Sequence, residues 1–176
     1  MFVARSCPVL AIVVTAATIA SCTDAPITGP TSPLESSFAS IPGTDPLECP
    51  TNQTLSESGT IGLLGGTVAV DGHSITLPFG AVVLPTTITL TVPASNYMEI
   101  DIRAGGLEHF TFREPARVVI DYSRCSRNNI EKGPLEAWYW DSGTRTLLED
   151  MDASDDPASS RVSFTTDHLS GYVVAN

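Results

Sequence analysis

Apolar and polar residues alternate with a period of two along most of the chain that follows Cys49. In residues 86–92, TTITLTV, Ile88, Leu90 and Val92 fall on one face and threonines fall on the other. This alternation is typical of a β-strand with one buried face. Residues 116–122 alternate in the same way, and further strands are predicted at 67–70, 73–77, 97–102, 135–140, 145–149, 161–165 and 170–175.

Turn-forming residues separate the predicted strands, and no segment has the apolar stripe of a helix. The turns are Gly65-Gly66, Asp71-Gly72, Gly105-Gly106, Lys132-Gly133-Pro134 and Ser142-Gly143. Asp71-Gly72 lies between two predicted strands and is a favoured pair for a two-residue hairpin. Eight or nine short strands at this spacing predict an all-β fold, an antiparallel β-sandwich or a sandwich-like barrel. The predicted domain, residues 49–176, is long enough to bury its own core.

The first residues follow a different pattern. A single cation, Arg5, precedes an apolar stretch from Val9 to Ala20, and small residues stand before Cys22. This order predicts a signal peptide over residues 1–21, since the apolar stretch is shorter than the roughly twenty residues that span a bilayer. Residues 19–22, IASC, resemble a bacterial lipobox, in which cleavage before the cysteine precedes acylation of its thiol. The sequence therefore predicts an exported cell-envelope protein with a lipid anchor on Cys22; secretion as a soluble binding domain is the alternative.

Residues 22–48 are rich in proline, serine and threonine and lack apolar periodicity. Such a segment buries too little surface to offset the entropy cost of ordering, so we expect a disordered tether. An N-terminal arm packed on the domain through Phe38 and Ile41 is the alternative.

The chain is strongly acidic, with a net charge of −11 that becomes −12 when the signal peptide removes Arg5. Nucleic acid is therefore not expected as a partner. Anionic lipid headgroups would also be repelled, so we expect the acyl chains, rather than the folded surface, to provide attachment to the membrane.

The four cysteines are expected to have different fates. Cys7 leaves with the signal peptide, Cys22 carries the lipid, and Cys49 and Cys125 remain. In an oxidising compartment these two are expected to form a disulfide, which stabilises the fold by roughly 4 to 5 kcal/mol in the chain-entropy model. Two buried free thiols or a redox pair are the alternatives.

Several short motifs, in this order, are similar to those of the ZU-five domain, which occurs in ankyrins, Unc-five netrin receptors and a zonula-occludens protein. They are GLLGGTV (62–68), ITLPFGA (75–81), TITL (87–90), FREPARV (112–118) and HLS (168–170), and together they span roughly residues 59–176. The resemblance implies a β-sandwich-like module that binds proteins. The domains that accompany it in signalling proteins are absent from this sequence, so their signalling roles do not transfer.

The resemblance also raises the question of self-cleavage, because a His-hydrophobic-Ser triplet cuts its own backbone in some relatives and in the similar GAIN domains. The matching residues are His168 as general base, Ser170 as nucleophile and the Leu169–Ser170 amide as the target. In an extended strand the two side chains are about 7 Å apart at Cα, so proton transfer needs a bend between them. A structural strand is the favoured interpretation, and Leu169 stands where phenylalanine is commoner.

Trp138 and Trp140 alternate with Tyr139 on one predicted strand. An exposed binding patch of Glu136, Trp138 and Trp140 is one interpretation, and a core on both faces of the strand is the favoured one. Four arginines, Arg113, Arg117, Arg124 and Arg127, form either a local cationic site for an acidic ligand or, as is favoured, a salt-bridged rim.

The other candidate motifs do not meet the requirements of their chemistry. The acidic run 149–156 has Asp155 and Arg161 where a calcium loop needs glycine and glutamate, so it is interpreted as a solvated loop. The glycine-rich stretch 59–66 precedes strands, whereas phosphate binding needs a helix N-terminus. His73 and His109 have no companion at metal-ligand spacing. The sequence therefore predicts a non-enzymatic protein without a metal or cofactor, whose partner is an unidentified protein or envelope component.

Overall fold

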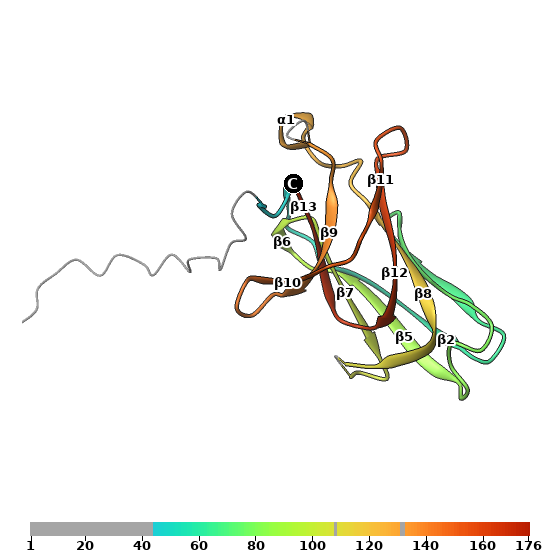
Figure 1. The fold of residues 1–176 in the computed structure, drawn as a ribbon. Coiled ribbons are helices and arrows are strands. Elements are labelled where there is room, and N and C mark those ends of the chain that lie inside the picture. Colours follow the sequence, from blue (N-terminus) through green and yellow to red (C-terminus); the bar gives the residue numbers. More distant parts are fainter. Residues whose placement is uncertain (1–43, 108, 131–132) are drawn as a thin grey trace, which may run out of the picture. The chain divides into compact units, whose positions relative to one another are not determined.

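The computed structural model describes residues 44–107, 109–130 and 133–176, and antiparallel strands make up most of these residues (Figure 1). The strands are β1 (Glu48–Thr51), β2 (Leu55–Ile61), β3 (Gly66–Val70), β4 (His73–Leu77), β5 (Thr86–Val92), β6 (Ser95–Tyr97), β7 (Glu99–Ala104), β8 (Thr111–Asp121), β9 (Glu136–Asp141), β10 (Thr146–Asp150), β11 (Ser154–Asp156), β12 (Arg161–His168) and β13 (Gly171–Ala175). One short helix, α1 (Arg127–Ile130), follows β8. The predicted all-β, sandwich-like fold is confirmed.

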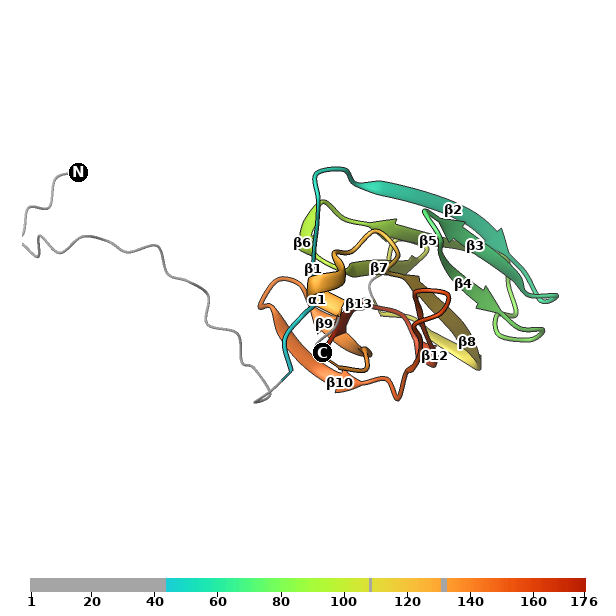
Figure 2. The same cartoon turned by 90° about the horizontal axis from the view of Figure 1, so that it is seen from above.

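Two sheets form the body of the domain. The six-stranded sheet has the order β10-β9-β13-β7-β5-β2, and the five-stranded sheet has the order β11-β12-β8-β4-β3. Figure 2 shows β2, β5 and β7 along one side of the domain and β3, β4 and β8 along the other. β1 and β6 form a separate two-stranded sheet, at the end of the domain where the described chain begins.

The core lies between the sheets and follows the alternation that the sequence shows. Ile88, Leu90 and Val92 of β5 are fully buried, and the threonines between them are not. Ile100 and Ile102 of β7 face the core in the same way, opposite Val118 and Ile120 of β8 in the other sheet. Burial of these branched side chains, at roughly 25 cal/mol per Å² of apolar surface, is the main force that holds the sheets together.

The predicted hairpin between residues 67–70 and 73–77 is confirmed. Val70 pairs with His73, and Asp71 and Gly72 have φ values of 49° and 85°. A two-residue turn with both central residues at positive φ matches the right-handed twist of the strands, which is why an Asp-Gly pair forms it.

The number of strands exceeds the eight or nine predicted, because thirteen are present in the described residues. β2 was not predicted, because most side chains between the half-buried Leu55 and the buried Ile61 are exposed, and LSESGTI lacks the apolar alternation of a half-buried strand. It also joined β6 to β7, which are separated at Met98. The very short β1 and β11 carry too few residues to show a period.

The domain begins earlier than predicted. Asp45 and Asn176 exchange two backbone hydrogen bonds, and Leu47 is 1% exposed. Leu47 also bonds to two parts of the domain, since its N–H donates to Val174 of β13 and its carbonyl oxygen accepts from Met98, between β6 and β7. The last residues of the predicted tether, 45–48, therefore belong to the folded domain. The predicted signal peptide, the lipidated Cys22 and the alternative contacts of Phe38 and Ile41 lie outside the described residues.

Cys49 and Cys125 form the predicted disulfide, which joins β1 to the turn after β8. Their Cα atoms are 5.0 Å apart, and both residues are buried. The bond therefore ties β1 to the end of β8, the longest strand of the five-stranded sheet. Within the described ranges, no helix is long and apolar enough to cross a membrane.

Candidate functional site

The outer face of the six-stranded sheet carries a groove, and the alternation of β7 decides which side chains reach it. Ile100 and Ile102 point into the core, so Glu99, Asp101 and Arg103 point outward. Residues paired across antiparallel strands share a face. Trp140 pairs with Gly171, Gly171 with Asp101, and Asp101 with Thr91, so these four residues form one row across β9, β13, β7 and β5.

Two adjoining hollows make up the groove, with volumes of about 370 and 430 Å³. Glu99, Trp140 and Ser142 line both of them. The rest of the lining is mainly polar in both hollows. The first hollow includes Asp101, Arg103, His109, Asp141 and Ser170, and the second includes Asn52, Asn96, Tyr97 and Arg145. We call this surface the sheet groove.

Glycine at position 171 keeps the floor of the sheet groove open. A Cβ atom at this position would lie 2.9 Å from the backbone carbonyl oxygen of Trp140, which is closer than real Cβ atoms approach. Because Gly171 lies between Trp140 and Asp101 in the row, the absence of a side chain there also leaves space between the indole and the carboxylate.

Three carboxylates of the sheet groove are held by neighbouring groups. Glu99 accepts a hydrogen bond from the indole Nε1–H of Trp140, and Asp101 accepts one of 2.6 Å from Nε of Arg103. The carboxylate of Asp141 accepts from the backbone N–H groups of Thr144 and Gly143, which hold the pKa of Asp141 below its ordinary value. The carboxylates therefore hold side chains and the β9–β10 turn in place, an arrangement suited to recognition.

Trp138 and Trp140 are buried rather than displayed, so the interpretation of an exposed patch with Glu136 is wrong. Their exposed fractions are 9% and 3%. They pack with Leu147, Val173 and Ala175 in a second apolar cluster on the outer face of the sheet, against Tyr97. The interpretation as a core on both faces of the strand holds, because the twisted β9–β10 hairpin and Tyr97 cover the indoles. Trp138 Nε1–H donates to Glu136 within its own strand.

The His168-Leu169-Ser170 triplet lies where β12 turns into β13, beside a register shift of β12 against β8 between Thr166 and His168. Nδ1 of the His168 imidazole lies 3.1 Å from Oδ1 of Asp167 and 3.4 Å from Oγ1 of Thr166. The ring also packs edge-on against Tyr139. The imidazole therefore lies among Asp167, Thr166 and the aromatic rings of Tyr139 and Tyr172.

Ser170 is buried at the edge of the sheet groove, and its backbone carbonyl oxygen accepts a hydrogen bond from Ile102. Leu169 is fully buried, and its N–H donates to Phe110. The triplet thus connects β12 of one sheet to β13 of the other, with its backbone bonded on both sides. This geometry supports the structural role that the sequence favours.

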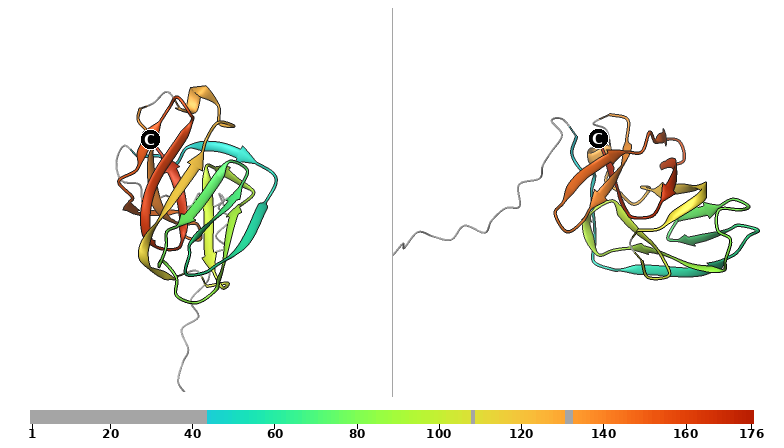
Figure 3. Two further views of the ribbon diagram at one scale, coloured as in Figure 1. Left: turned by 90° about the vertical axis from the view of Figure 1, so that its right-hand side faces the viewer. Right: turned by 60° about the horizontal axis from the view of Figure 1, so that its bottom comes forward.

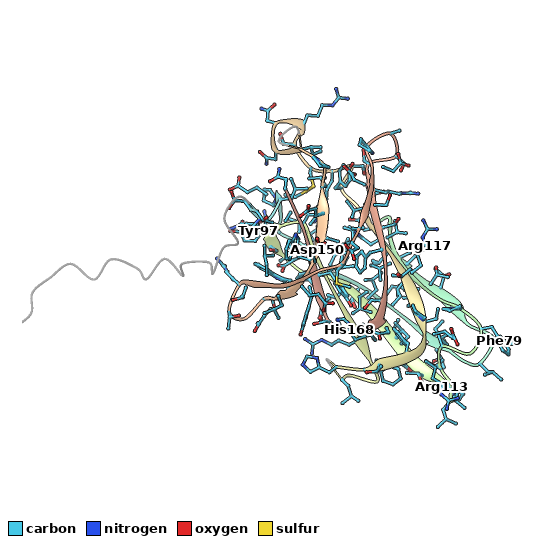
Figure 4. All side chains as sticks on the ribbon, in the orientation of Figure 1. Phe79, Tyr97, Arg113, Arg117, Asp150 and His168 are labelled. Atoms are coloured by element: carbon cyan, nitrogen blue, oxygen red, sulfur yellow. A yellow bond between two sulfur atoms is a disulfide. The ribbon has the colours of Figure 1, made fainter. Side chains whose placement is uncertain are left out.

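The four arginines do not form one patch. Arg113 and Arg117 lie at different heights along β8 in Figure 4, and Arg124 and Arg127 follow the end of that strand. Arg124 forms an ion pair of 3.6 Å with Asp71. Since β8 rises about 3.3 Å per residue, the arginines are distributed along the length of the domain. This spread does not fit the alternative of a local cationic site, and the ion pair of Arg124 agrees with the favoured salt-bridged rim.

The two histidines have different surroundings. His73 is 1% exposed, and its Nδ1 accepts a hydrogen bond from the N–H of Asp121. Burial, with Arg124 nearby, lowers the pKa of His73 to about 4, so the ring is neutral at pH 7. His109 instead lines the sheet groove.

The acidic run 149–156 is partly structural. Asp155 accepts hydrogen bonds from the phenol of Tyr122 and the N–H of Leu135, and Asp156 accepts from Ser159. Asp150 accepts from the N–H of Asp152. These carboxylates close turns and fix β11 to the rest of the domain.

The sheet groove was not predicted, although the sequence marks some of its residues as outward-facing. Glu99, Asp101 and Arg103 alternate with isoleucines in a predicted strand, which marks them as outward-facing. Their neighbours Trp140, Ser142 and Gly171 come from distant parts of the chain, and only the strand order β9-β13-β7 brings them together. Comparison with protein-family models gives no matching family, and comparison with curated proteins gives no match.

Proposed function

We propose that the protein is a non-enzymatic binding module of the cell envelope, exported and lipid-anchored at Cys22, with a ZU-five-like β-domain that recognises a partner through the sheet groove. The single observation that carries the proposal is the pair of adjoining hollows, about 370 and 430 Å³, that share Glu99, Trp140 and Ser142. Hollows of this size fall within the range of ligand-binding sites, and Tyr97 and Trp140 add aromatic surface to a lining that is otherwise mainly polar.

The chemistry of the groove supports binding rather than catalysis. Glu99, Asp101 and Asp141 each accept a hydrogen bond from a neighbouring group, so their oxygens hold the shape of the site. A general base would instead need an oxygen directed at a substrate proton. The rigid sheet beneath them favours recognition of an extended segment lying across the strands.

The charge of the chain supports a basic or neutral partner. At −12 after loss of Arg5, the mature protein produces a long-range negative potential that attracts cations and repels acidic proteins. We therefore expect the partner to be a polar segment of an envelope protein with basic residues.

The position in the envelope rests on the N-terminal pattern and on the disulfide. Disulfides persist in oxidising compartments, which agrees with export. Metabolic labelling with a fatty-acid analogue tests the anchor: the wild-type chain should incorporate label, and Cys22→Ala should not. A wild-type chain without label, matched by the variant, would refute lipidation.

The sheet groove is tested by placing a photo-crosslinking amino acid at Ser142, which is exposed and lines both hollows. Ala69 on β3, exposed and in the other sheet, is the matched control position. In cells, position 142 should give a crosslinked band that position 69 does not give. Addition of Asn96→Arg, which places bulk and charge in the second hollow, should remove that band. Identical products from both positions would exclude the groove as the recognition surface.

A further inference from the structure

Exposed apolar side chains gather on two adjoining loops of the domain. Of the seven large apolar side chains that are exposed in the described residues, five lie in the segments 62–65 and 78–85: Leu63 (48%), Leu64 (84%), Phe79 (66%), Val83 (52%) and Leu84 (74%). We call these two segments the apolar tip. Scattered exposed leucines are ordinary on protein surfaces, but a cluster of this kind marks an interaction site.

Backbone contacts hold the two loops of the apolar tip together. The N–H of Gly80 donates a 2.9 Å hydrogen bond to the carbonyl oxygen of Leu63. Gly65, at φ 78°, approaches so closely that a Cβ atom there would lie 2.3 Å from the carbonyl oxygen of Leu77. The tip is therefore one preformed surface rather than two independent loops.

The apolar tip lies at the end of the domain opposite to the described N-terminal residues and the C-terminus. The loop between β2 and β3 and the loop between β4 and β5 project at the far right in Figure 2 and in the right-hand view of Figure 3, whereas the C-terminus lies at the other side of the domain. Figure 4 shows Phe79 at this far end. The tip is therefore separated from the sheet groove, whose residues lie on β7, β9 and β6.

Few charged residues lie near the apolar tip, although the protein is acidic. Residues 74–98 contain no Asp, Glu, Lys or Arg, and residues 58–70 contain none either. Arg113 and Glu114 are the charged residues next to the tip; Arg113 N–H donates to the carbonyl oxygen of Ala81. A net charge of −11 thus coexists with an extended uncharged region.

Several backbone carbonyl groups of the apolar tip are bonded within the protein. Gly62 and Pro78 carbonyl oxygens accept from Gly65 and Ala81, and the Leu84 carbonyl oxygen accepts from the Thr86 hydroxyl at 2.9 Å. With the bonds from Gly80 to Leu63 and from Arg113 to Ala81, five carbonyl groups of the tip have partners within the protein. Each of these bonds lowers the cost of moving the tip backbone out of water, because backbone in contact with lipid needs its polar groups bonded.

We propose that the apolar tip inserts into the interfacial region of a lipid bilayer. The protruding leucines and phenylalanine supply buried apolar area, and the bonded carbonyls lower the cost of removing water. The two loops themselves carry no charged side chain, and the charged Arg113 and Glu114 beside them suit the headgroup region rather than the hydrocarbon. The domain's acidic charge favours zwitterionic over anionic lipid. The proposal rests on neither the sheet groove nor the lipid anchor, and it differs from the sequence expectation that only acyl chains contact the membrane.

Quenching by brominated phosphatidylcholine tests the insertion with the full chain and its lipid anchor in place. Leu84→Trp adds an indole at the tip, and Leu148→Trp adds one at an exposed leucine on β10 as the matched control. The emission of wild-type protein, from Trp138 and Trp140, is subtracted from both. Bound to vesicles, the indole at position 84 should be blue-shifted and quenched, and the one at position 148 should not.

The second test uses a chain with Cys22→Ala, which has no lipid anchor. In that chain, Leu64→Asp combined with Leu84→Asp should lower the affinity for vesicles by roughly a hundredfold, since burial of each leucine contributes about tenfold. Circular dichroism identifies a variant that fails to fold, and the quenching measurement then decides alone. An unquenched indole at position 84, on protein that co-floats with vesicles, would overturn the proposal. So would a lipid-free dimer that the double Asp variant abolishes, since the tip would then bind a second copy.

Discussion

The phenol of Tyr172 donates a 2.6 Å hydrogen bond to the carbonyl oxygen of His168, four residues earlier in the chain. The hydroxyl of Thr166 donates to the same oxygen at 2.8 Å. Burial raises the pKa of the Tyr172 phenol well above its ordinary value, so the group stays protonated and remains a donor. These bonds fix the first peptide of the His168-Leu169-Ser170 triplet at the crossing from one sheet to the other.

Tyr172→Phe should lower the free energy of unfolding by about 1 to 2 kcal/mol, because a buried carbonyl oxygen loses one of its two donors. Urea unfolding monitored by tryptophan fluorescence measures the change. Val83→Ala, at an exposed loop position, is the control and should change stability by no more than about 0.5 kcal/mol. Equal stabilities of wild type and Tyr172→Phe would contradict a structural role for this bond.

The Leu169–Ser170 bond should remain intact in the purified protein. The imidazole of His168 contacts Asp167 and Thr166, and the backbone of the triplet is held on both sides. Intact mass spectrometry under denaturing conditions should show one chain that ends at Asn176. Release of the heptapeptide SGYVVAN from wild type, and its loss in Ser170→Ala, would establish self-cleavage instead.

The disulfide between Cys49 and Cys125 anchors the N-terminal strand β1 and should stabilise the fold. Replacement of both Cys49 and Cys125 by alanine should lower the free energy of unfolding by about 4 kcal/mol, because the bond closes a loop with a sequence separation of 76. In a strong reductant, the free energy of unfolding of wild type, measured with urea, should approach that of the double variant. A single variant is a poorer comparison, since it leaves a reactive thiol. Unchanged stability in the double variant would show that the loop constraint contributes nothing.

The sequence predicted the fold where one strand face is buried and the turn chemistry is strong. Ile88, Leu90 and Val92 mark β5 with the bounds that the structure has, and Asp71-Gly72 marks its hairpin. β2 escaped prediction because an edge strand with an exposed face needs few apolar residues, and Ser56, Ser58 and Thr60 instead pair with threonines of β5.

The sites were harder to predict than the fold, since they depend on which strands become neighbours. Trp140, Gly171 and Asp101 lie in one row only because β13 enters the sheet between β9 and β7. The burial of Trp138 and Trp140 agrees with the favoured interpretation from the sequence, but the residues that cover them, Tyr97 and Leu147, come from other segments and could not be predicted. The apolar tip is present in the sequence as Leu63-Leu64 and Phe79, but only the folded loops show that these side chains are exposed together.

Stability should depend on Asp155, which lies in the acidic run but serves a buried partner. Its two carboxylate oxygens accept from the Tyr122 phenol at 2.7 Å and the Leu135 N–H at 3.2 Å. Asp155→Ala should cost about 2 to 4 kcal/mol, because two buried donors lose their acceptor. Glu149→Ala, an exposed acid in the same run, is the control and should change stability by about 0.5 kcal/mol or less. Equal losses in thermal unfolding would indicate a general charge effect rather than these bonds.

Acid should destabilise the protein partly through His73. The ordinary pKa of histidine is 6.5, and burial lowers that of His73 to about 4 in the folded state. Between pH 6.5 and 4 the unfolded chain therefore binds a proton that the native ring does not accept, and stability falls as the pH falls. Asp71 and Asp121 oppose this shift, and Arg124 reinforces it.

His73→Asn isolates this contribution, because the amide oxygen can replace Nδ1 as acceptor of the Asp121 N–H without titrating in this range. From pH 7 to pH 4, wild type should lose about 3 kcal/mol more stability than the variant, since each pKa unit corresponds to about 1.4 kcal/mol. Urea unfolding at several pH values measures both curves. Parallel curves for wild type and His73→Asn would show that the ring is already charged in the folded protein or that its surroundings admit water.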